Sequence, residues 1–521
     1  MAKKRRRQTQ KASKQAPDRP RTQISFQQIE SAPWFLPALA LLGLLMAFLL
    51  FDGNLSLSGD NAQFINLGRS LAAGHGLSET LGDEPTPHTK YPFGFPVLLA
   101  IVHLLIPGSL TALKGLICLL YALSIPLIYK FIRTYESPPL ALSVCLICLL
   151  SPPLLDFSHQ VMSEIPYLTA SLMALLLLKK AGDQPKLRNL IIGIFAIMAT
   201  YYIRTAGVVL VGTGILYFLL RKQYKETGIL AGGCLLLALP WTLRNASLGS
   251  ADYVNQLLSI NPYRPDEGLL TLPTLIERIA TNLQIYFLHV IPGIFVPSWI
   301  TDFNWPLGLI VSALLLHALF HGIKNARLPA VYLTCHLGLH LLWPQVWSDI
   351  RFLLPAIPIF LYLIFKSAVH LLHQLSERVS GLPTRAILIV LLLLTLLSNI
   401  QATQRLSERN GSFPPNWKSY FQAGDWIRQN TRDDVKIACR KPFLMNATAN
   451  RKTTGYVWET PDGVIQDFEQ KGVDIVVVDQ LGFSSTPRYL VPAVNANKNR
   501  FQLLRQIPNS NTFILKFVHT P

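Results

Sequence analysis

The chain has 521 residues, half of them apolar, and 47 Lys and Arg against 29 Asp and Glu give a formal net charge of +18. The apolar residues are gathered in long runs with few charges, among them 33–51, 110–132 and 190–220. About 20 apolar residues suffice to cross the hydrocarbon core of a bilayer. A water-soluble fold could not bury so many uninterrupted runs, so the composition excludes a soluble protein and predicts an α-helical polytopic membrane protein.

The N-terminal segment 1–32 is a basic tail, and Asp18 is the only acid among its first 22 residues. Such a tail is compatible with nucleic-acid binding or nuclear targeting. Lys and Arg before a first span also hold that end in the cytoplasm and contact anionic membrane lipids. We favour this second interpretation, with no nucleic-acid partner, and expect the apolar run that follows to be an uncleaved anchor with Trp34 at the interface.

The apolar runs predict a transmembrane domain over 33–400 with about eleven to thirteen spans. Eleven spans are clear, at 33–51, 110–132, 139–155, 165–180, 189–203, 206–220, 227–243, 306–322, 329–343, 351–369 and 385–400. Two shorter apolar segments, 93–106 and 283–297, suit helices lying at the outer interface, and they would raise the count to thirteen if both cross.

Positive charge sets the predicted orientation. Alternate loops all carry Lys or Arg, whereas the opposite loops 52–109, 156–164 and 244–305 are mostly long or acidic. Because cytoplasmic loops are enriched in Lys and Arg, we expect a cytoplasmic N-terminus and these three loops outside. The chain is thus predicted to be a multi-pass protein of the plasma (inner) membrane.

From about residue 412 the sequence has the texture of a soluble α/β domain, which this topology places outside the membrane. Segments 417–429 and 464–470 have helical periodicity. The run 474–478 is almost entirely β-branched and apolar, as in a strand buried on both faces. Three further strands are expected at 435–438, 501–504 and 512–517, so 412–521 is predicted to be an extracytoplasmic α/β domain.

Two acids in the predicted outer loops are candidate catalytic groups. Asp60 begins an amphipathic helix with Phe64 and Leu67 on one face. It fits a helix N-cap or a carboxylate that takes a proton from an acceptor hydroxyl. Glu164 opens the span after the second loop, where it suits the helix dipole, yet acids at membrane depth tend to be functional.

Two arginines at the outer ends of spans are candidate phosphate ligands. Arg204 interrupts an apolar stretch, and Arg351 stands two positions after Asp349. On local grounds we favour arginines that reach the interface separately, or an Asp349–Arg351 surface pair. The alternative is a cationic clamp for a phosphate, because guanidinium matches phosphate geometry. His336 and His340 have metal-compatible spacing on one helix face, but no acid stands beside them, so packed histidines are favoured.

Several stretches carry a family resemblance when taken in chain order. They are G-D-N-A-Q-F, L-A-A-G-H-G and K-Y-P-F-G-F-P in the first loop, S-H-Q-V-M-S-E-I-P-Y in the second, and then Y-Y-I-R-T-A-G and R-F-L-L-P-A-I-P. Together they resemble GT-C glycosyltransferases of families 39 and 83, the bacterial branch with lipid A aminoarabinose transferases and protein O-mannosyltransferase homologues. The resemblance covers roughly 30–400, and the C-terminal α/β domain resembles outer domains of that branch.

The resemblance implies a GT-C fold and an inverting sugar transfer from a polyprenyl-phosphate donor at the outer leaflet. It places the catalytic carboxylate of the first loop on Asp60, the acid of the second loop on Glu164 and the donor-binding lysine on Lys90. The chain departs from the family pattern in two ways. It has Y-P-F where many relatives have adjacent prolines, and a single acid at position 60 where relatives have a D-E pair.

The expected reaction is attack by an acceptor hydroxyl on the anomeric carbon, with Asp60 as base or orienting group. Lys90, Arg204 and Arg351 would converge on the departing lipid phosphate, whose charge grows in the transition state. Further contacts to donor or acceptor are expected from the side chains His88, Tyr91 and His159. The acceptor class, lipid, glycan or protein, stays open. No nucleotide is needed, no metal ligands are assigned, and the use of a divalent metal is left open.

Two other functions fit a polytopic envelope protein. A lipid or glycan transporter or flippase would be supported by inverted repeats or broken helices at mid-membrane, and neither is evident. A surface-polysaccharide ligase uses similar lipid-linked donors. An outer-face cavity lined by Asp60 and Glu164 would favour the transferase, whereas a tunnel at mid-membrane would favour the transporter.

Overall fold

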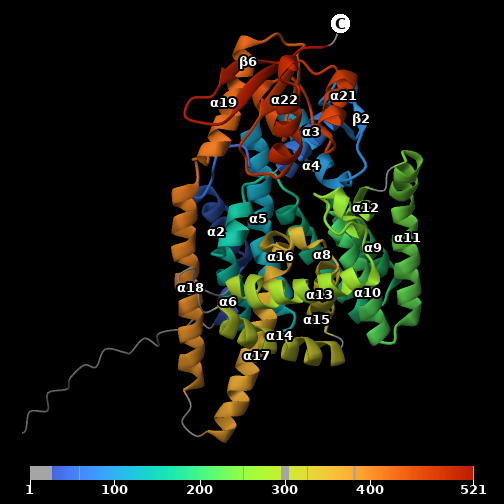
Figure 1. Cartoon of the computed structure of the whole chain (residues 1–521). Coiled ribbons are helices and arrows are strands. Elements are labelled where there is room, and N and C mark those ends of the chain that lie inside the picture. The colour runs from blue at the N-terminus through green and yellow to red at the C-terminus, as the bar shows by residue number, and fades with distance from the viewer. Residues whose placement is uncertain are drawn as a thin grey trace, which may run out of the picture.

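The computed structural model describes residues 26–57, 59–249, 252–294, 304–325, 327–379 and 383–519. Most of the predicted basic tail lies outside these ranges, as do Ser58 and part of the predicted loop 244–305. A helical bundle carries a smaller α/β domain at one end, and this domain is formed by the C-terminal part of the chain (Figure 1).

A helix occupies each of the eleven predicted spans. These helices are α2 (Phe35–Leu49), α5 (Leu110–Arg133), α6 (Pro138–Leu149), α8 (Glu164–Asp183), α9 (Leu187–Ile203), α10 (Val208–Leu220), α11 (Tyr224–Ser247), α14 (Asn304–Lys324), α15 (Leu328–Leu341), α17 (Ile357–Arg378) and α18 (Thr384–Arg409). In the described ranges, six helices are long and apolar enough to cross a membrane, namely α5, α8, α11, α14, α17 with the turn before it, and α18. The other five are shorter apolar helices. The prediction of a polytopic helical membrane protein is confirmed.

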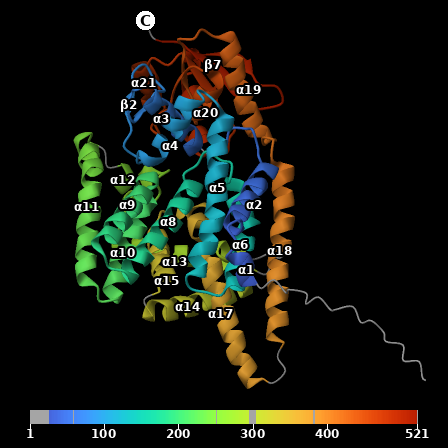
Figure 2. The ribbon, with the colours of Figure 1, turned by 180° about the vertical axis from the view of Figure 1, so that it is seen from behind.

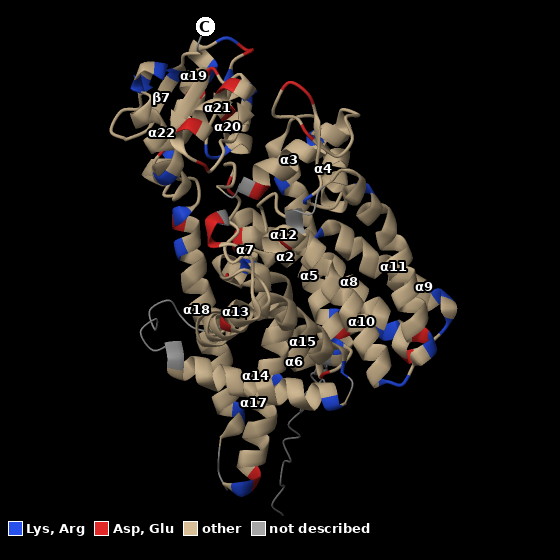
Figure 3. Cartoon of the chain, turned by 45° about the vertical axis from the view of Figure 1, so that its right-hand side comes forward, with Lys and Arg blue, Asp and Glu red and all other residues tan. Residues whose placement is uncertain are grey.

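The surface of the bundle suits a lipid environment. Leu235 and Leu236 of α11, and Leu393 and Leu397 of α18, are exposed apolar side chains. Charged residues gather toward the ends of the long helices and on the C-terminal domain (Figure 3). One predicted span departs from the others, because α14 runs across the end of the bundle farthest from the C-terminal domain (Figures 1–3). It packs there against α15 and α17.

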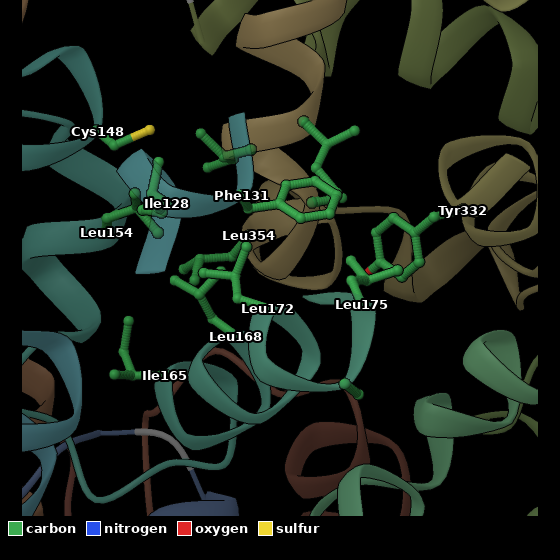
Figure 4. Close-up of a cluster of buried hydrophobic side chains, with 14 of the residues drawn as sticks. Ile128, Phe131, Cys148, Leu154, Ile165, Leu168, Leu172, Leu175, Tyr332 and Leu354 are labelled. Carbon is green, nitrogen blue, oxygen red and sulfur yellow. The ribbon is translucent and has the colours of Figure 1, made fainter. Parts of the chain in front are cut away.

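The core of the bundle is centred on α8. Leu168 and Leu172 of α8 lie beside Leu354, and Leu175 lies beside Tyr332 of α15 (Figure 4). All four leucines and Tyr332 are buried. Close packing leaves such side chains little freedom to shift, so the first turn of α8, which begins at Glu164, is held in a fixed position.

The first predicted outer loop folds into a compact layer between the bundle and the C-terminal domain. It contains α3 (Gly59–Ala72), a hairpin of β1 (Ser78–Glu79) and β2 (Thr86–Pro87), and α4 (Gly94–Leu105). Helix α3 lies directly on α4, where a side chain at Gly68 would come within 2.7 Å of Leu99. Helix α4 is the short apolar helix expected at 93–106, and it exposes Leu104 and Leu105.

The second ambiguous segment, 283–297, is not a separate helix. It begins in the last turn of α13 (Leu272–Ile285), continues as a π-helix over Tyr286–Val290 and a 3-10 turn at Pro292–Ile294, and then leaves the described ranges. The remaining short helices of the bundle region are α1 (Phe26–Glu30), α7 (Pro152–Phe157), α12 (Asp252–Leu258) and α16 (Ile350–Leu353).

The C-terminal part forms a five-stranded mixed sheet of order β4-β3-β5-β7-β6. The strands are β3 (Lys436–Ala438), β4 (Lys452–Thr454), β5 (Ile475–Val478), β6 (Phe501–Gln506) and β7 (Phe513–Phe517). Strands β3, β4 and β5 are parallel, and β7 and β6 are antiparallel to their neighbours. The helices are α19 (Pro415–Asn430), α20 (Pro442–Ala449), α21 (Pro461–Lys471) and α22 (Val491–Ala496).

Strand β5 is buried on both faces, as its sequence predicts. Ile475 and Val477 pack in one apolar cluster with α19 and α20, while Val476 and Val478 pack in a second cluster with α21 and α22. The sheet is therefore covered by helices on both sides.

The C-terminal domain contacts the first-loop layer through apolar packing, a backbone hydrogen bond and ion pairs. Ala62 of α3 is buried in the apolar cluster of α19 and α20, and α20 lies beside α3 (Figure 2). The backbone of Thr453 in β4 donates to Leu81 O at 2.9 Å. Asp83 forms ion pairs with Lys436 and Lys452 of the sheet. The domain therefore lies directly over the start of α3.

Candidate active site

Five of the charged residues singled out in the sequence lie at helix ends that face the C-terminal domain. Asp60 is in the first turn of α3, and Glu164 begins α8. Arg204 follows α9, Arg351 lies in the short α16, and Lys90 stands in the loop before α4. The fold thus brings together groups separated by up to 291 positions in the chain.

A cavity of about 260 Å³ opens between these helix ends. Asp60, Lys90, Arg204 and Arg351 all line it, together with Tyr91. The three cations were expected to converge on one site beside Asp60, and all four side chains line this one cavity.

Arg351 connects the two acids. Its Nη2 donates to Asp60 Oδ2 at 2.7 Å, and its Nε donates to Glu164 Oε1 at 2.5 Å. Nη1 of Arg204 lies 2.9 Å from the same Glu164 oxygen. Both guanidinium groups also lie 5.6 Å from the ring centroid of Phe352, at cation–π distance. The two arginines therefore do not reach the interface separately, and Arg351 pairs with distant acids instead of the neighbouring Asp349.

Asp60 is held as a carboxylate. Burial raises its pKa, but the charges of Arg351 and Lys90, with hydrogen bonds from Arg351 and Tyr91, lower the pKa to about 2. Tyr91 Oη donates to Oδ1 at 2.9 Å, so each carboxylate oxygen has a side-chain donor. These donors belong to other elements of the fold, which an N-cap role alone does not explain. Asp60 is therefore ionised throughout the neutral pH range.

Glu164 occupies a different position from the one expected. Its side chain is 0 % exposed, and it stands behind Arg204 and Arg351 instead of on the cavity wall. Its Oε2 has no hydrogen-bond partner among the described residues. Placed at the rigid start of α8, Glu164 fixes the two guanidinium groups while both still face the cavity.

Lys90 differs from the two arginines in its contacts with acids. Its Nζ lies 5.2 Å from the ring centroid of Tyr91, and within the described ranges it forms no ion pair. Its charge nevertheless acts on Asp60. Lys90 therefore presents an available positive charge to the cavity.

The three further side chains expected to contact substrate are separated by the fold. Tyr91 lines the cavity. His88 does not, because its ring is buried and holds the first loop: Nδ1 lies 2.8 Å from Glu79 Oε1, and Nε2 accepts the backbone N–H of Tyr91 at 2.7 Å. His159 lies apart, with its ring 6.2 Å from that of Phe51, and burial lowers its pKa to about 4. His88 therefore supports the loop that carries Lys90 and Tyr91, and His159 does not line the cavity.

Several cavity residues were not singled out in the sequence. Tyr263 and Trp347 meet across 84 positions, with Trp347 Nε1 donating to Tyr263 Oη at 3.0 Å, and Trp343, Gln256 and Phe352 also line the cavity. The closely spaced tryptophans before Arg351 were the available signal. Together these side chains make the lining of the cavity partly aromatic.

No three His, Cys, Asp or Glu side chains within the described part of the chain lie close enough together to hold a metal. His336 and His340, which have metal-compatible spacing, are packed in the core with their rings stacked at 4.4 Å between centroids. His336 Nε2 lies 3.2 Å from Phe352 O, and His340 Nδ1 lies 2.7 Å from His336 O. These contacts fit structural histidines, and His336 supports the backbone of Phe352, which lines the cavity.

Comparison with known proteins gives one family match and several similar folds. The family model described as dolichyl-phosphate-mannose-protein mannosyltransferase matches residues 90–243. No curated protein matches the chain in sequence. Among solved structures, ArnT from Cupriavidus metallidurans bound to undecaprenyl phosphate has a TM-score of 0.58 at 11% identity, covering 94% of this chain and 99% of that one.

Two further structures have the same architecture. ArnT from Cupriavidus metallidurans in the apo state has a TM-score of 0.56 at 11% identity, with 92% of this chain and 97% of that one covered. The oligosaccharyltransferase from Archaeoglobus fulgidus, in complex with zinc and sulfate, has a TM-score of 0.56 at 11% identity, with 91% and 72% covered. Taken with the apolar helices, these structures show that the chain is a multi-pass membrane protein with the fold of GT-C glycosyltransferases, and the family match adds a likeness to mannosyltransferases over residues 90–243.

Proposed function

We propose that the chain transfers a sugar from a polyprenyl-phosphate-linked donor to an acceptor hydroxyl in the cavity beside Asp60. The observation that carries this proposal is that one carboxylate and three cations, Lys90, Arg204 and Arg351, line a single cavity at the helix ends under the C-terminal domain. A lipid phosphate needs several positive charges close together, and its leaving oxygen needs them most in the transition state.

The chemistry of the donor follows from these cations. Guanidinium groups bind phosphate in bidentate geometry, and Arg204 and Arg351 lie next to each other on the same Glu164 oxygen. ArnT, whose fold is similar, was crystallised with undecaprenyl phosphate. We infer that the lipid phosphate of the donor binds between the two arginines, with Lys90 as a third charge, and that its prenyl chain lies along the bundle.

Arg351 would change partners when the donor binds. Without donor, its guanidinium is shared between Asp60 and Glu164. A phosphate at the arginines draws Arg351 away from Asp60, and the loss of that ion pair raises the pKa of Asp60 from about 2 toward its ordinary value. A carboxylate released in this way is a stronger base at the moment when the acceptor hydroxyl must lose its proton.

The proposed step is a single displacement at the anomeric carbon. The acceptor oxygen forms the new bond to that carbon while the bond from carbon to the phosphate oxygen breaks. The electron pair of the broken bond stays on the lipid phosphate, and the hydroxyl proton passes to the Asp60 carboxylate. Attack opposite the leaving phosphate inverts the anomeric configuration.

We also propose that the helix ends carrying the cavity, and the C-terminal domain above them, face the extracytoplasmic side of the plasma membrane. The Lys/Arg pattern of the loops supports this orientation. The position of the cavity at the helix ends suits transfer at the membrane surface, whereas a transporter needs a path through the bundle. A reporter active only in the cytoplasm, fused after Asn399, should be silent.

The test of function is the transfer rate of Asp60→Asn in proteoliposomes supplied with an undecaprenyl-phosphate-linked sugar. Loss of a catalytic base typically lowers the rate by about 10²–10⁴-fold, and we expect that loss with donor binding retained. The matched control is Glu84→Gln, which removes an exposed acid from the same loop and should leave the rate unchanged. A folded Asp60→Asn variant with the wild-type rate would exclude the proposed mechanism.

A further inference from the structure

Two adjacent cations of the C-terminal domain, Arg440 and Lys441, stand together without a matching acid. Both lie over one aromatic ring: the Arg440 guanidinium carbon is 4.7 Å and the Lys441 Nζ 4.3 Å from the centroid of Phe483. Arg440 also lies 5.4 Å from the ring centroid of Trp458. In the described residues neither side chain forms an ion pair or a hydrogen bond, and Nε of Arg440 is buried without a partner.

Two acids act on this pair from a distance, Asp479 on both cations and Asp60 on Lys441, but neither acid forms an ion pair with Arg440 or Lys441. Asp479 is buried, and its carboxylate accepts from the backbone of Leu481 at 3.0 Å and from Thr486 Oγ1 at 3.2 Å. Burial raises the pKa of Asp479. Burial and the charge of Arg440 lower the pKa of the Lys441 ammonium group to about 8. Two neighbouring cations repel each other, and their N–H groups have no acceptors here, so the arrangement is unfavourable in free energy. A bound anion would supply the missing acceptors and the opposite charge.

The pair lies next to the proposed active site. Lys441 directly precedes α20, which packs on α3 (Figure 2), and Ala62, two positions after Asp60, is buried in the same apolar cluster as α20. The charges of Asp60 and Lys90 both act on the Lys441 ammonium group. Neither Arg440 nor Lys441 lines the cavity of Arg204 and Arg351, so the two cation groups form separate sites on the Asp60 region.

We propose that Arg440 and Lys441 bind an anionic group, a phosphate or a carboxylate, carried by the acceptor. This inference rests on the proposed function, because it assigns the cavity cations to the donor phosphate and the C-terminal domain pair to the other substrate. Asp60 lies within the electrostatic reach of both groups of cations. An acceptor anchored by its anionic group at Phe483 therefore presents its hydroxyl next to the carboxylate that takes the proton.

The first test uses inorganic phosphate as the probe and needs no substrate. Lysines of the purified full-length protein are reductively methylated with ¹³C, and the Lys441 resonance is identified by its loss in Lys441→Gln. Sodium phosphate should shift this resonance saturably, and Arg440→Gln should weaken the apparent affinity at least tenfold. A Lys441 resonance that moves no more with phosphate than with sodium chloride of equal ionic strength would overturn the proposal.

The second test compares glycolipid acceptors that differ in one group, a phosphate, a carboxylate or a hydroxyl, with an undecaprenyl-phosphate-linked sugar as donor. Wild-type protein should prefer one of the anionic acceptors at least tenfold in kcat/KM, and the preferred acceptor identifies the anion. Arg440→Gln/Lys441→Gln should abolish this preference and retain binding of undecaprenyl phosphate. The matched control is Lys418→Gln/Arg505→Gln, which removes two exposed cations elsewhere on the same domain.

The outcomes separate this proposal from the proposed function. Two results contradict an acceptor site at Arg440 and Lys441. In the first, the doubly substituted variant keeps the preference for an anionic acceptor. In the second, the same variant no longer binds undecaprenyl phosphate. If the wild type neither binds undecaprenyl phosphate nor transfers sugar, while phosphate still shifts Lys441, the proposed function fails and the anion site stands.

Discussion

Replacing Glu164 by Gln should destabilise the protein, because Glu164 is the buried counter-charge of two arginines. Its Oε1 lies 2.5 Å from Arg351 Nε and 2.9 Å from Arg204 Nη1, and the side chains of Glu164, Arg351 and Arg204 are 0, 22 and 14 % exposed. Removing one partner of a buried ion pair costs about 3–5 kcal/mol. Asp60 still offsets one of the two positive charges, so we expect the lower end, about 3 kcal/mol, or roughly a hundredfold in the folding equilibrium.

The assay is thermal unfolding in lipid nanodiscs, with and without undecaprenyl phosphate. Glu164→Gln should unfold at a clearly lower temperature, and undecaprenyl phosphate should stabilise the variant more than the wild type, because the bound phosphate replaces the missing negative charge. The control is Glu136→Gln, in the turn between α5 and α6. Glu136 also pairs with two cations, Lys366 and Arg327, but these are 30 and 43 % exposed, so the loss should stay near 1 kcal/mol without extra stabilisation by the lipid. An unchanged unfolding temperature in Glu164→Gln would refute this reasoning.

Three further predictions concern the donor, the domain contact and pH. Lys90→Gln should weaken binding of undecaprenyl phosphate about tenfold, the value of one charged hydrogen bond, with unchanged thermal stability; unchanged affinity would remove Lys90 from the phosphate site. Asp83→Asn should speed hydrogen exchange at the Thr453 amide, which bonds Leu81, because Asp83 ties the first loop to Lys436 and Lys452; exchange as slow as in the wild type would contradict this. The pKa of Lys441 is lowered to about 8, so between that pH and the ordinary lysine pKa the unfolded chain binds more protons than the folded one. The stability of the wild type relative to Lys441→Gln should therefore rise as pH increases from 8 to 10. A stability difference that does not depend on pH would contradict the lowered pKa.

The membrane helices were predictable because their signal is local. Each predicted span contains a helix, since a run of apolar residues must form its backbone hydrogen bonds within itself. The directions of the helices were less predictable: α14 has the composition of a span, and only the folded structure shows that it runs across the end of the bundle (Figure 3). The apolar run at 283–297 likewise gave no indication that it continues α13.

The C-terminal domain shows the same contrast between local and long-range information. The strands β3, β5, β6 and β7 were predicted because each has an apolar or β-branched core. Strand β4, with the sequence Lys-Thr-Thr, was missed because a short polar edge strand exists only through its pairing with β3. Its backbone bond to Leu81 depends on contact with the first loop.

In the candidate site, residue types were predictable and partnerships were not. Charged residues at apolar helix ends pointed to Asp60, Glu164, Arg204 and Arg351, but the sequence could not show that Arg351 bonds acids 187 and 291 positions away. Hence Glu164 was expected on the cavity wall, and His159 was grouped with a site from which the fold separates it. Arg440 and Lys441 have no local feature that sets them apart, since their significance lies in the absence of partners and in the contact of α20 with α3.

The most direct test of the central claim is a structure of the protein with undecaprenyl phosphate bound, determined by cryo-electron microscopy in nanodiscs. We predict that the lipid phosphate lies within hydrogen-bond distance of Arg204 and Arg351, that Lys90 turns toward it, and that Arg351 has left Asp60 while keeping Glu164. A phosphate bound away from these three cations, with the Arg351–Asp60 ion pair intact, would contradict the account.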